Sequence, residues 1–123
     1  MTHPYLLTLP LHGTADSGWL AVAEGDNLPF TVQRAYWIFD VPTGRVRGRH
    51  THRTLEQLLI AVHGELRVTI EVPGTAPQEF TLTHPTQALY VPPGSWRAIE
   101  FSAGAALLSL ASHAYDEADY VRG

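Results

Sequence analysis

The segment 65–72 alternates polar and apolar side chains, and this period of two constrains the fold more than any other feature of the chain. Its apolar residues, from Leu66 to Val72, share one face of an extended strand, and its polar residues, from Glu65 to Glu71, share the other. The pattern is typical of a strand with one buried face and one face in water.

Seven more segments are predicted as strands from their alternation or their β-branched and aromatic content: 19–24, 32–40, 54–62, 79–82, 88–91, 96–101 and 106–111. Turn signals such as Pro42-Thr43-Gly44 and Pro92-Pro93-Gly94 separate them. Short strands with regular turns indicate an all-β sandwich or closed barrel. A chain of 123 residues has the size of one domain, so we expect residues 1–123 to form a single domain.

Two of these segments allow more detailed predictions. In 32–40, Arg34 and Tyr36 share a face, and Trp37 and Phe39 share the opposite face. The segment 54–62 has an alternative reading as a helix, but it lacks a polar face and Gly64 follows at once, so we predict a central strand. The last residues, 115–123, are expected to form a short helical or irregular tail packed on the outside.

Composition excludes several kinds of chemistry. The chain has no cysteine, which removes disulfides and thiolate sites, and no lysine, which removes Schiff-base catalysis. Its net charge of −4 argues against nucleic acid as a partner. The amino-terminal residues lack the pattern of a signal peptide, and no segment approaches the ~20 apolar residues of a membrane span. We therefore expect a cytoplasmic protein that does not bind membranes.

His50 and His52 form the sharpest local signal. Residues i and i+2 of an extended chain point to the same side, so both imidazoles project into one space. Such a pair suits metal ligation or proton transfer, because both need a neutral ring nitrogen near pH 7. An accidental surface pair is the alternative when the motif is taken alone.

The surrounding spacing resembles the cupin signature, Gly-x5-His-x-His-(x3–4)-Glu-x6-Gly followed by Pro-x-Gly-x2-His. The matching positions are Gly44, His50, His52, Gly64, Pro92 and Gly94. The resemblance implies a cupin-type double-stranded β-helix, or jelly-roll, barrel. Two ligand positions depart from the signature: Gln57 stands at the glutamate position, with Glu56 beside it, and Arg97 stands at the last histidine. An amide is a weak ligand and a guanidinium repels a metal, so we expect no metal cofactor.

Longer blocks are similar to a narrower cupin family, the dTDP-4-dehydro-6-deoxyglucose 3,4-ketoisomerases. The blocks are 27–30, 34–40, 47–53, 56–57, 89–92, 96, 101–102, 110–112, 115–117 and 119–122. The resemblance implies a metal-independent isomerase that moves a ketone from C4 to C3 of a dTDP-linked 6-deoxyhexulose through an enediol. It also implies a homodimer, for which the amino-terminal strand is a candidate for exchange between subunits.

The resemblance also implies roles for individual residues. His50 would act as the base and acid at carbon, while His52 and Tyr36 would handle protons on the sugar oxygens. Substrate would be bound by five further residues: Arg34, Arg47, Gln57, Trp96 and Arg97. Of these, Trp96 would form a wall for the thymine or the sugar, and Gly48 would permit a bulge or a close backbone approach.

Two residues differ from the family pattern. Ser17 stands where the family usually has an arginine that contributes to the substrate site, and Arg97 replaces the family's histidine. Two alternatives to the isomerase therefore stay open. One is a metal-dependent cupin enzyme with His50, His52 and Glu56 as ligands. The other is a cupin that binds a sugar nucleotide without catalysis.

Overall fold

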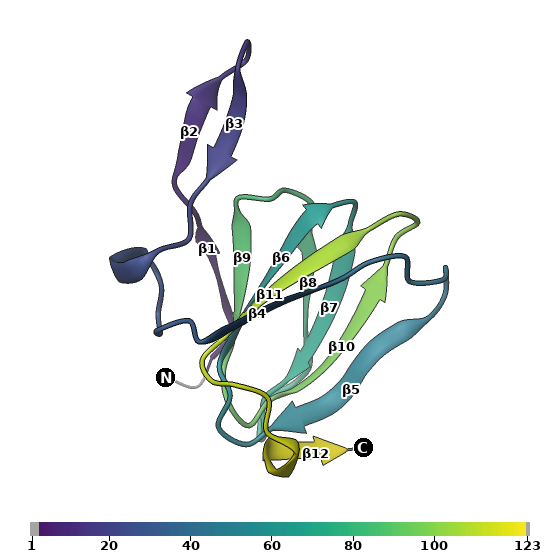
Figure 1. The fold of residues 1–123 in the computed structure, drawn as a ribbon. Coiled ribbons are helices and arrows are strands. Elements are labelled where there is room, and N and C mark those ends of the chain that lie inside the picture. Colours follow the sequence, from purple (N-terminus) through teal and green to yellow (C-terminus); the bar gives the residue numbers. More distant parts are fainter. Residues whose placement is uncertain (1–2, 123) are drawn as a thin grey trace.

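The computed structural model describes residues 3–122, whose regular secondary structure consists of antiparallel strands and two short 3-10 turns (Figure 1). One five-stranded sheet has the order β1 (Tyr5–Thr8), β9 (Gln87–Val91), β6 (Gln57–His63), β11 (Ala106–Ala111), β4 (Arg34–Ile38). The other has the order β12 (Tyr120–Arg122), β5 (Val46–His52), β10 (Trp96–Phe101), β7 (Leu66–Glu71), β8 (Gln78–Leu82). The all-β prediction is confirmed, and the two sheets form the jelly-roll barrel expected of a cupin.

The main core fills the space between the two sheets. It combines apolar residues of β6, β9 and β11 with those of β7, β8 and β10, including Leu59, Leu89, Val68 and Ile99. The alternation of β7 is confirmed, since Leu66, Val68 and Ile70 are fully buried while Arg67 and Glu71 are exposed. Apolar side chains of successive strands thus meet in one continuous layer, which holds the sheets together.

A second apolar cluster covers the outer face of the first sheet. Leu58 and Ile60 of β6 pack there with Tyr90 of β9, beneath Leu28 and Phe30 of the segment that precedes β4. Because β6 is buried on both faces, its sequence has no polar face, and the prediction of a central strand is confirmed. The strand begins at Gln57 rather than at residue 54, because the backbone N–H groups of Thr54 and Glu56 bond to side chains.

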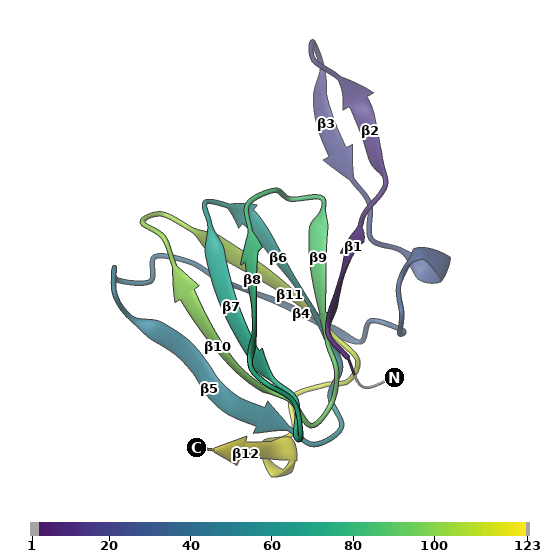
Figure 2. The same ribbon diagram turned by 180° about the vertical axis from the view of Figure 1, so that it is seen from behind.

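A hairpin of β2 (Leu11–Thr14) and β3 (Gly18–Ala21) stands away from the barrel in both views (Figures 1 and 2). All of its strand residues except Ala21 are exposed, Trp19 and Leu20 to more than 60%. The predicted strands do not include β1 or β2, which are four residues each and give little periodic signal.

The carboxyl-terminal segment is not an outer tail, and that prediction is corrected. A single 3-10 turn, η2 (Glu117–Asp119), leads into β12, which pairs with β5 and places Tyr120 opposite His52. Asp119 is buried at 5% exposure. The other helical turn, η1 (Gly25–Asn27), is equally short, and no helix within residues 3–122 is long and apolar enough to cross a membrane.

Candidate active site

His50 and His52 project from β5 to the same side, as their spacing predicted. Their Nε2 atoms lie 3.0 Å apart and their rings are nearly perpendicular, at 86°. His52 is buried at 3% exposure, while His50 is half-buried and lines a cavity of about 440 Å³. The two imidazoles are therefore hydrogen-bonded in series, with His50 facing the cavity and His52 behind it.

A β-bulge in β5 brings Arg47 to the same cavity. Arg97 of β10 pairs with His50 and Ala98 pairs with Gly48, so Arg49 is the extra residue. Without the bulge, Arg47 and His50, three residues apart, would face opposite sides of the strand. Gly48 has a φ of 90°, and a Cβ atom there would lie 3.1 Å from the Arg97 carbonyl oxygen. The prediction of a bulge and a close backbone approach at Gly48 is confirmed.

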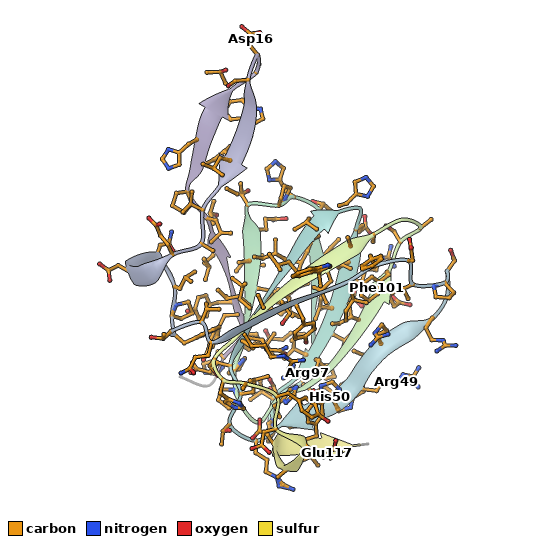
Figure 3. All side chains as sticks on the ribbon, in the orientation of Figure 1. Asp16, Arg49, His50, Arg97, Phe101 and Glu117 are labelled. Carbon is orange, nitrogen blue, oxygen red and sulfur yellow. The ribbon has the colours of Figure 1, made fainter. Side chains whose placement is uncertain are left out.

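The carboxyl-terminal segment closes the side of the site behind the histidines. The Tyr120 ring lies 4.9 Å from the His50 ring and 4.4 Å from the His52 ring, measured between centroids. Asp119 places its Oδ2 atom 3.5 Å from His52 Nδ1. Figure 3 shows His50 and Arg97 at the end of the barrel that carries Glu117, the first residue of η2. The predicted set of site residues contains neither Asp119 nor Tyr120.

Arg97 is the buried cation of the site. Its side chain is 2% exposed, with Nη1 donating to Gln57 Oε1 and Nη2 donating to the Ser95 carbonyl oxygen at 3.3 Å. Within residues 3–122, its Nε is the one buried side-chain nitrogen or oxygen without a hydrogen-bond partner. Burial lowers the pKa of the guanidinium to about 10, so it stays charged at neutral pH.

The Arg97 contact also orients Tyr36. Because a guanidinium only donates, Gln57 must turn its Oε1 toward Arg97 and its Nε2 toward the other side. That Nε2 donates to the Tyr36 hydroxyl oxygen at 2.9 Å and to Ser109 Oγ at 3.0 Å. The Tyr36 oxygen therefore accepts within the protein, and its own proton can be donated to a molecule in the cavity.

Two arginines add positive charge to the cavity. Arg34 lies two residues before Tyr36 on the same face of β4. Its guanidinium carbon is 4.5 Å from the centroid of the Tyr36 ring and 5.6 Å from that of the Tyr115 ring. Arg47 lines the same cavity from β5. The structure thus brings together seven of the predicted residues: Tyr36, His50, His52, Arg34, Arg47, Gln57 and Arg97.

Trp96 is not among them, and the expectation of a wall at this cavity is corrected. Successive residues of a strand face opposite sides, and Arg97, Ile99 and Phe101 are buried toward the barrel interior. Trp96 therefore lies on the outer face of β10, where it lines a separate surface hollow with Val46 and Arg49. Ser17 is also remote, because it lies in the hairpin, whose tip carries Asp16 at the far end of the molecule from His50 (Figure 3).

Electrostatics keep His52 neutral. Burial, followed by the nearby charge of Arg97 and the His50 ring, lowers the pKa of His52 to about 3, against an opposing effect of Asp119. Burial raises the pKa of Asp119, but hydrogen bonds from Thr54 and Leu55 outweigh it, and the net pKa is lowered. The site therefore pairs a neutral imidazole with an ionised carboxylate at neutral pH.

The set of ligands considered for a metal cupin does not assemble. Glu56 points away from the histidines, and its Oε1 accepts a hydrogen bond from the Tyr90 hydroxyl at 2.6 Å on the outer side of the first sheet. Among residues 3–122, no three histidine, aspartate or glutamate side chains are placed to hold a metal ion. The alternative with His50, His52 and Glu56 as ligands is therefore wrong in its third ligand.

Comparison with known proteins places the chain among characterised relatives. The family model described as FdtA, WxcM-like, C-terminal matches residues 3–123. A TDP-4-oxo-6-deoxy-alpha-D-glucose-3,4-oxoisomerase of Aneurinibacillus thermoaerophilus is 41% identical over 104 residues, which are 84% of this chain and 74% of that protein.

Solved structures of similar proteins agree with this match. A mutant of the 3,4-ketoisomerase QdtA from Thermoanaerobacterium thermosaccharolyticum, in complex with TDP-4-keto-6-deoxyglucose, has a TM-score of 0.92 and 31% identity, covering 100% of this chain and 89% of that one. The WlaRB TDP-quinovose 3,4-ketoisomerase from Campylobacter jejuni has a TM-score of 0.91 and 34% identity, covering 100% of this chain and 95% of that one.

Proposed function

Because the chain belongs to the FdtA family of sugar-nucleotide 3,4-ketoisomerases, as its sequence blocks predicted, we propose that it moves the keto group of a TDP-linked 6-deoxyhexulose from C4 to C3. The observation that carries the assignment is the combination of hydrogen-bonded histidines with a buried arginine at one cavity. A proton acceptor and a fixed cation are what an enediolate intermediate requires.

The proposed reaction uses His50 at carbon. His50 takes the proton from C3, the electron pair of that C–H bond forms the C3–C4 double bond, and negative charge develops on the C4 oxygen. Tyr36 donates a proton to that oxygen and then, as a phenolate, takes the proton of the C3 hydroxyl as the C3 carbonyl forms. His50 then returns a proton to C4, so the sugar is isomerised without net oxidation or reduction.

His52 takes a role different from the one expected from the sequence. It does not line the cavity, since His50 stands between it and the open space. We assign it to a hydrogen bond that orients the His50 ring, rather than to direct contact with the sugar oxygens. Arg34 and Arg47 bind the diphosphate, because both line the cavity and their forked donors match phosphate oxygens.

Arg97 stabilises the enediolate in this proposal, because it lines the cavity and carries a buried positive charge. Replacement by Gln is expected to lower kcat by about 10²-fold, with a smaller change in KM, as for the loss of an oxyanion donor. Steady-state kinetics measure both changes, in kcat and in KM. The matched control is Arg67→Gln, an exposed arginine on the neighbouring β7, which should retain wild-type kinetics. Equal kinetics for both variants would remove Arg97 from the reaction.

The direct test of the activity is incubation with TDP-4-keto-6-deoxyglucose, with the position of the carbonyl followed by ¹³C NMR. We expect a 3-keto product, formed at the same rate after dialysis against a chelator because the proposed steps use no metal. A rate that depends on added divalent metal would favour a metal-dependent enzyme. Binding of TDP without any conversion would favour the non-catalytic alternative.

A homodimer is part of the proposal. Trp37, on the outward side of the edge strand β4, is 64% exposed, and Phe39, just after this strand, is 60% exposed. The extended hairpin exposes Trp19 and Leu20. Two such apolar surfaces on a small chain indicate a self-association surface. Trp37→Glu is expected to convert a dimer into a monomer at micromolar concentration, as measured by light scattering. A wild-type protein that is already monomeric there would contradict the dimer.

The remaining expectations stand as proposals of the same kind. Residues 1–123 act as a single cupin domain, and the protein works in the cytoplasm, where its sugar-nucleotide substrate would be supplied. Its net charge of −4 fits a small-molecule partner rather than nucleic acid.

A further inference from the structure

Asp119 is held rigidly at the back of the site. Its Oδ1 accepts hydrogen bonds from Thr54 N at 2.8 Å and from Thr54 Oγ1 at 2.7 Å, and its Oδ2 accepts one from Leu55 N at 3.1 Å. The same Oδ2 lies 3.5 Å from His52 Nδ1 and 3.6 Å from Nε2 of the more exposed His113. Asp119 does not line the cavity, and His52 is the site histidine that it faces.

The charge state of Asp119 determines which nitrogen of His52 carries the proton. An ionised carboxylate only accepts, so the His52 nitrogen that faces it, Nδ1, is the one that carries hydrogen in the neutral ring. His52 Nε2 is then an acceptor. Since it lies 3.0 Å from His50 Nε2, the hydrogen bond between the two histidines runs from His50 to His52.

We propose that Asp119 is a positioning residue that fixes the tautomer of His52 and thereby directs the hydrogen bond from His50 to His52. The proposal rests on the proposed isomerase function. When His50 takes the C3 proton on its other ring nitrogen, its Nε2–H stays hydrogen-bonded to the neutral His52, so the positive charge remains on His50. The direction of this bond leaves the other ring nitrogen of His50 free as the base at C3, and the protonated His50 then returns a proton to C4.

Asp119→Asn tests this assignment with little change in shape. The amide oxygen can keep the two bonds from Thr54, which leaves the amide N–H₂ facing His52 Nδ1 and Leu55 N. A donor at that place favours the other tautomer of His52 and reverses the bond to His50. We expect kcat to fall about 10- to 100-fold with KM nearly unchanged. Histidine ¹⁵N NMR of the ligand-free protein should show the His52 proton move from Nδ1 to Nε2.

Thr54→Val is the matched control. It removes the hydroxyl bond to Asp119 Oδ1, and so weakens the attachment of the carboxyl-terminal segment, but it leaves the carboxylate beside His52. If Asp119 serves only to attach that segment, both variants lose stability and neither changes the tautomer. We expect Thr54→Val to lower the free energy of unfolding while keeping the wild-type His52 tautomer and a kcat within about 3-fold of wild type.

The NMR measurement separates this proposal from the proposed function. A wild-type His52 that carries its proton on Nε2 overturns the positioning role, even if Asp119→Asn does not fold. An unchanged kcat in folded Asp119→Asn also overturns it. A wild-type protein with the expected tautomer but no conversion of the TDP-keto sugar rejects the proposed function and supports the assigned geometry.

Discussion

Replacing His50 by asparagine should lower turnover of TDP-4-keto-6-deoxyglucose by about 10³-fold, because it removes the one imidazole that both faces the cavity and bonds to the second histidine. Asparagine keeps polarity and approximate size but cannot take up a proton near pH 7. The half-buried position of His50 suggests that the barrel tolerates the change. Single-turnover kinetics with circular dichroism of the variant measure both effects.

The matched control is His63→Asn. His63 lies at the end of β6, is exposed, and contacts the Gly104 carbonyl oxygen at 3.0 Å, outside the cavity. The His63→Asn substitution should leave turnover unchanged. A His50→Asn protein that folds and turns over at the wild-type rate would show that the carbon base is another residue.

The second large effect is on stability as a function of pH. The pKa of His52 is about 3 in the folded protein, lowered chiefly by burial and then by Arg97 and His50, against an ordinary value of 6.5 in the unfolded chain. Between these two pH values His52 binds a proton in the unfolded state but not in the folded state. The contribution of His52 to the free energy of unfolding is therefore fully present above pH 6.5 and is lost as the pH falls toward 3. We expect this loss to amount to about 2 kcal/mol between pH 7 and pH 5.

Urea unfolding at pH 7 and pH 5 measures this loss, with His52→Gln as the control. Glutamine does not titrate, so the variant should show a smaller loss of unfolding free energy between the two pH values. The lowered pKa of Asp119 acts in the same direction, but only below its ordinary value of 3.8, outside this interval. Equal pH dependence in the wild type and in His52→Gln would mean that His52 is not held neutral by the fold.

The sequence predicted the barrel and most of the site because these features depend on local patterns. A period of two identifies strands, and it also places Tyr36 inside and Trp37 outside on β4. The same rule, applied to 96–101, would have placed Arg97 inward with Ile99 and Phe101, and Trp96 outward. The alternation of 96–101 therefore indicates an outward Trp96, against the wall that the family resemblance implies.

Asp119 and Tyr120 were not predicted as site residues because their position depends on pairing between distant parts of the chain. Nothing in the sequence near residue 119 indicates that β12 adds to β5 beside His52. Only the short run Tyr120-Val121 hints at a strand, without naming its partner. Glu56 and Gln57 show the opposite case, since adjacent residues of an extended chain must face opposite sides and only one of them can face the cavity.

The central claim is that His50 transfers protons between solvent-exchangeable positions and the sugar carbons. Its most direct test is the reaction of TDP-4-keto-6-deoxyglucose in D₂O, with deuterium located by NMR in the recovered substrate and in the product. The expected result is deuterium at C4 of the 3-keto product, absent when His50→Asn replaces the wild type. A folded His50→Asn protein that forms the 3-keto product at the wild-type rate, with the same deuterium content at C4, would contradict the proton-transfer account.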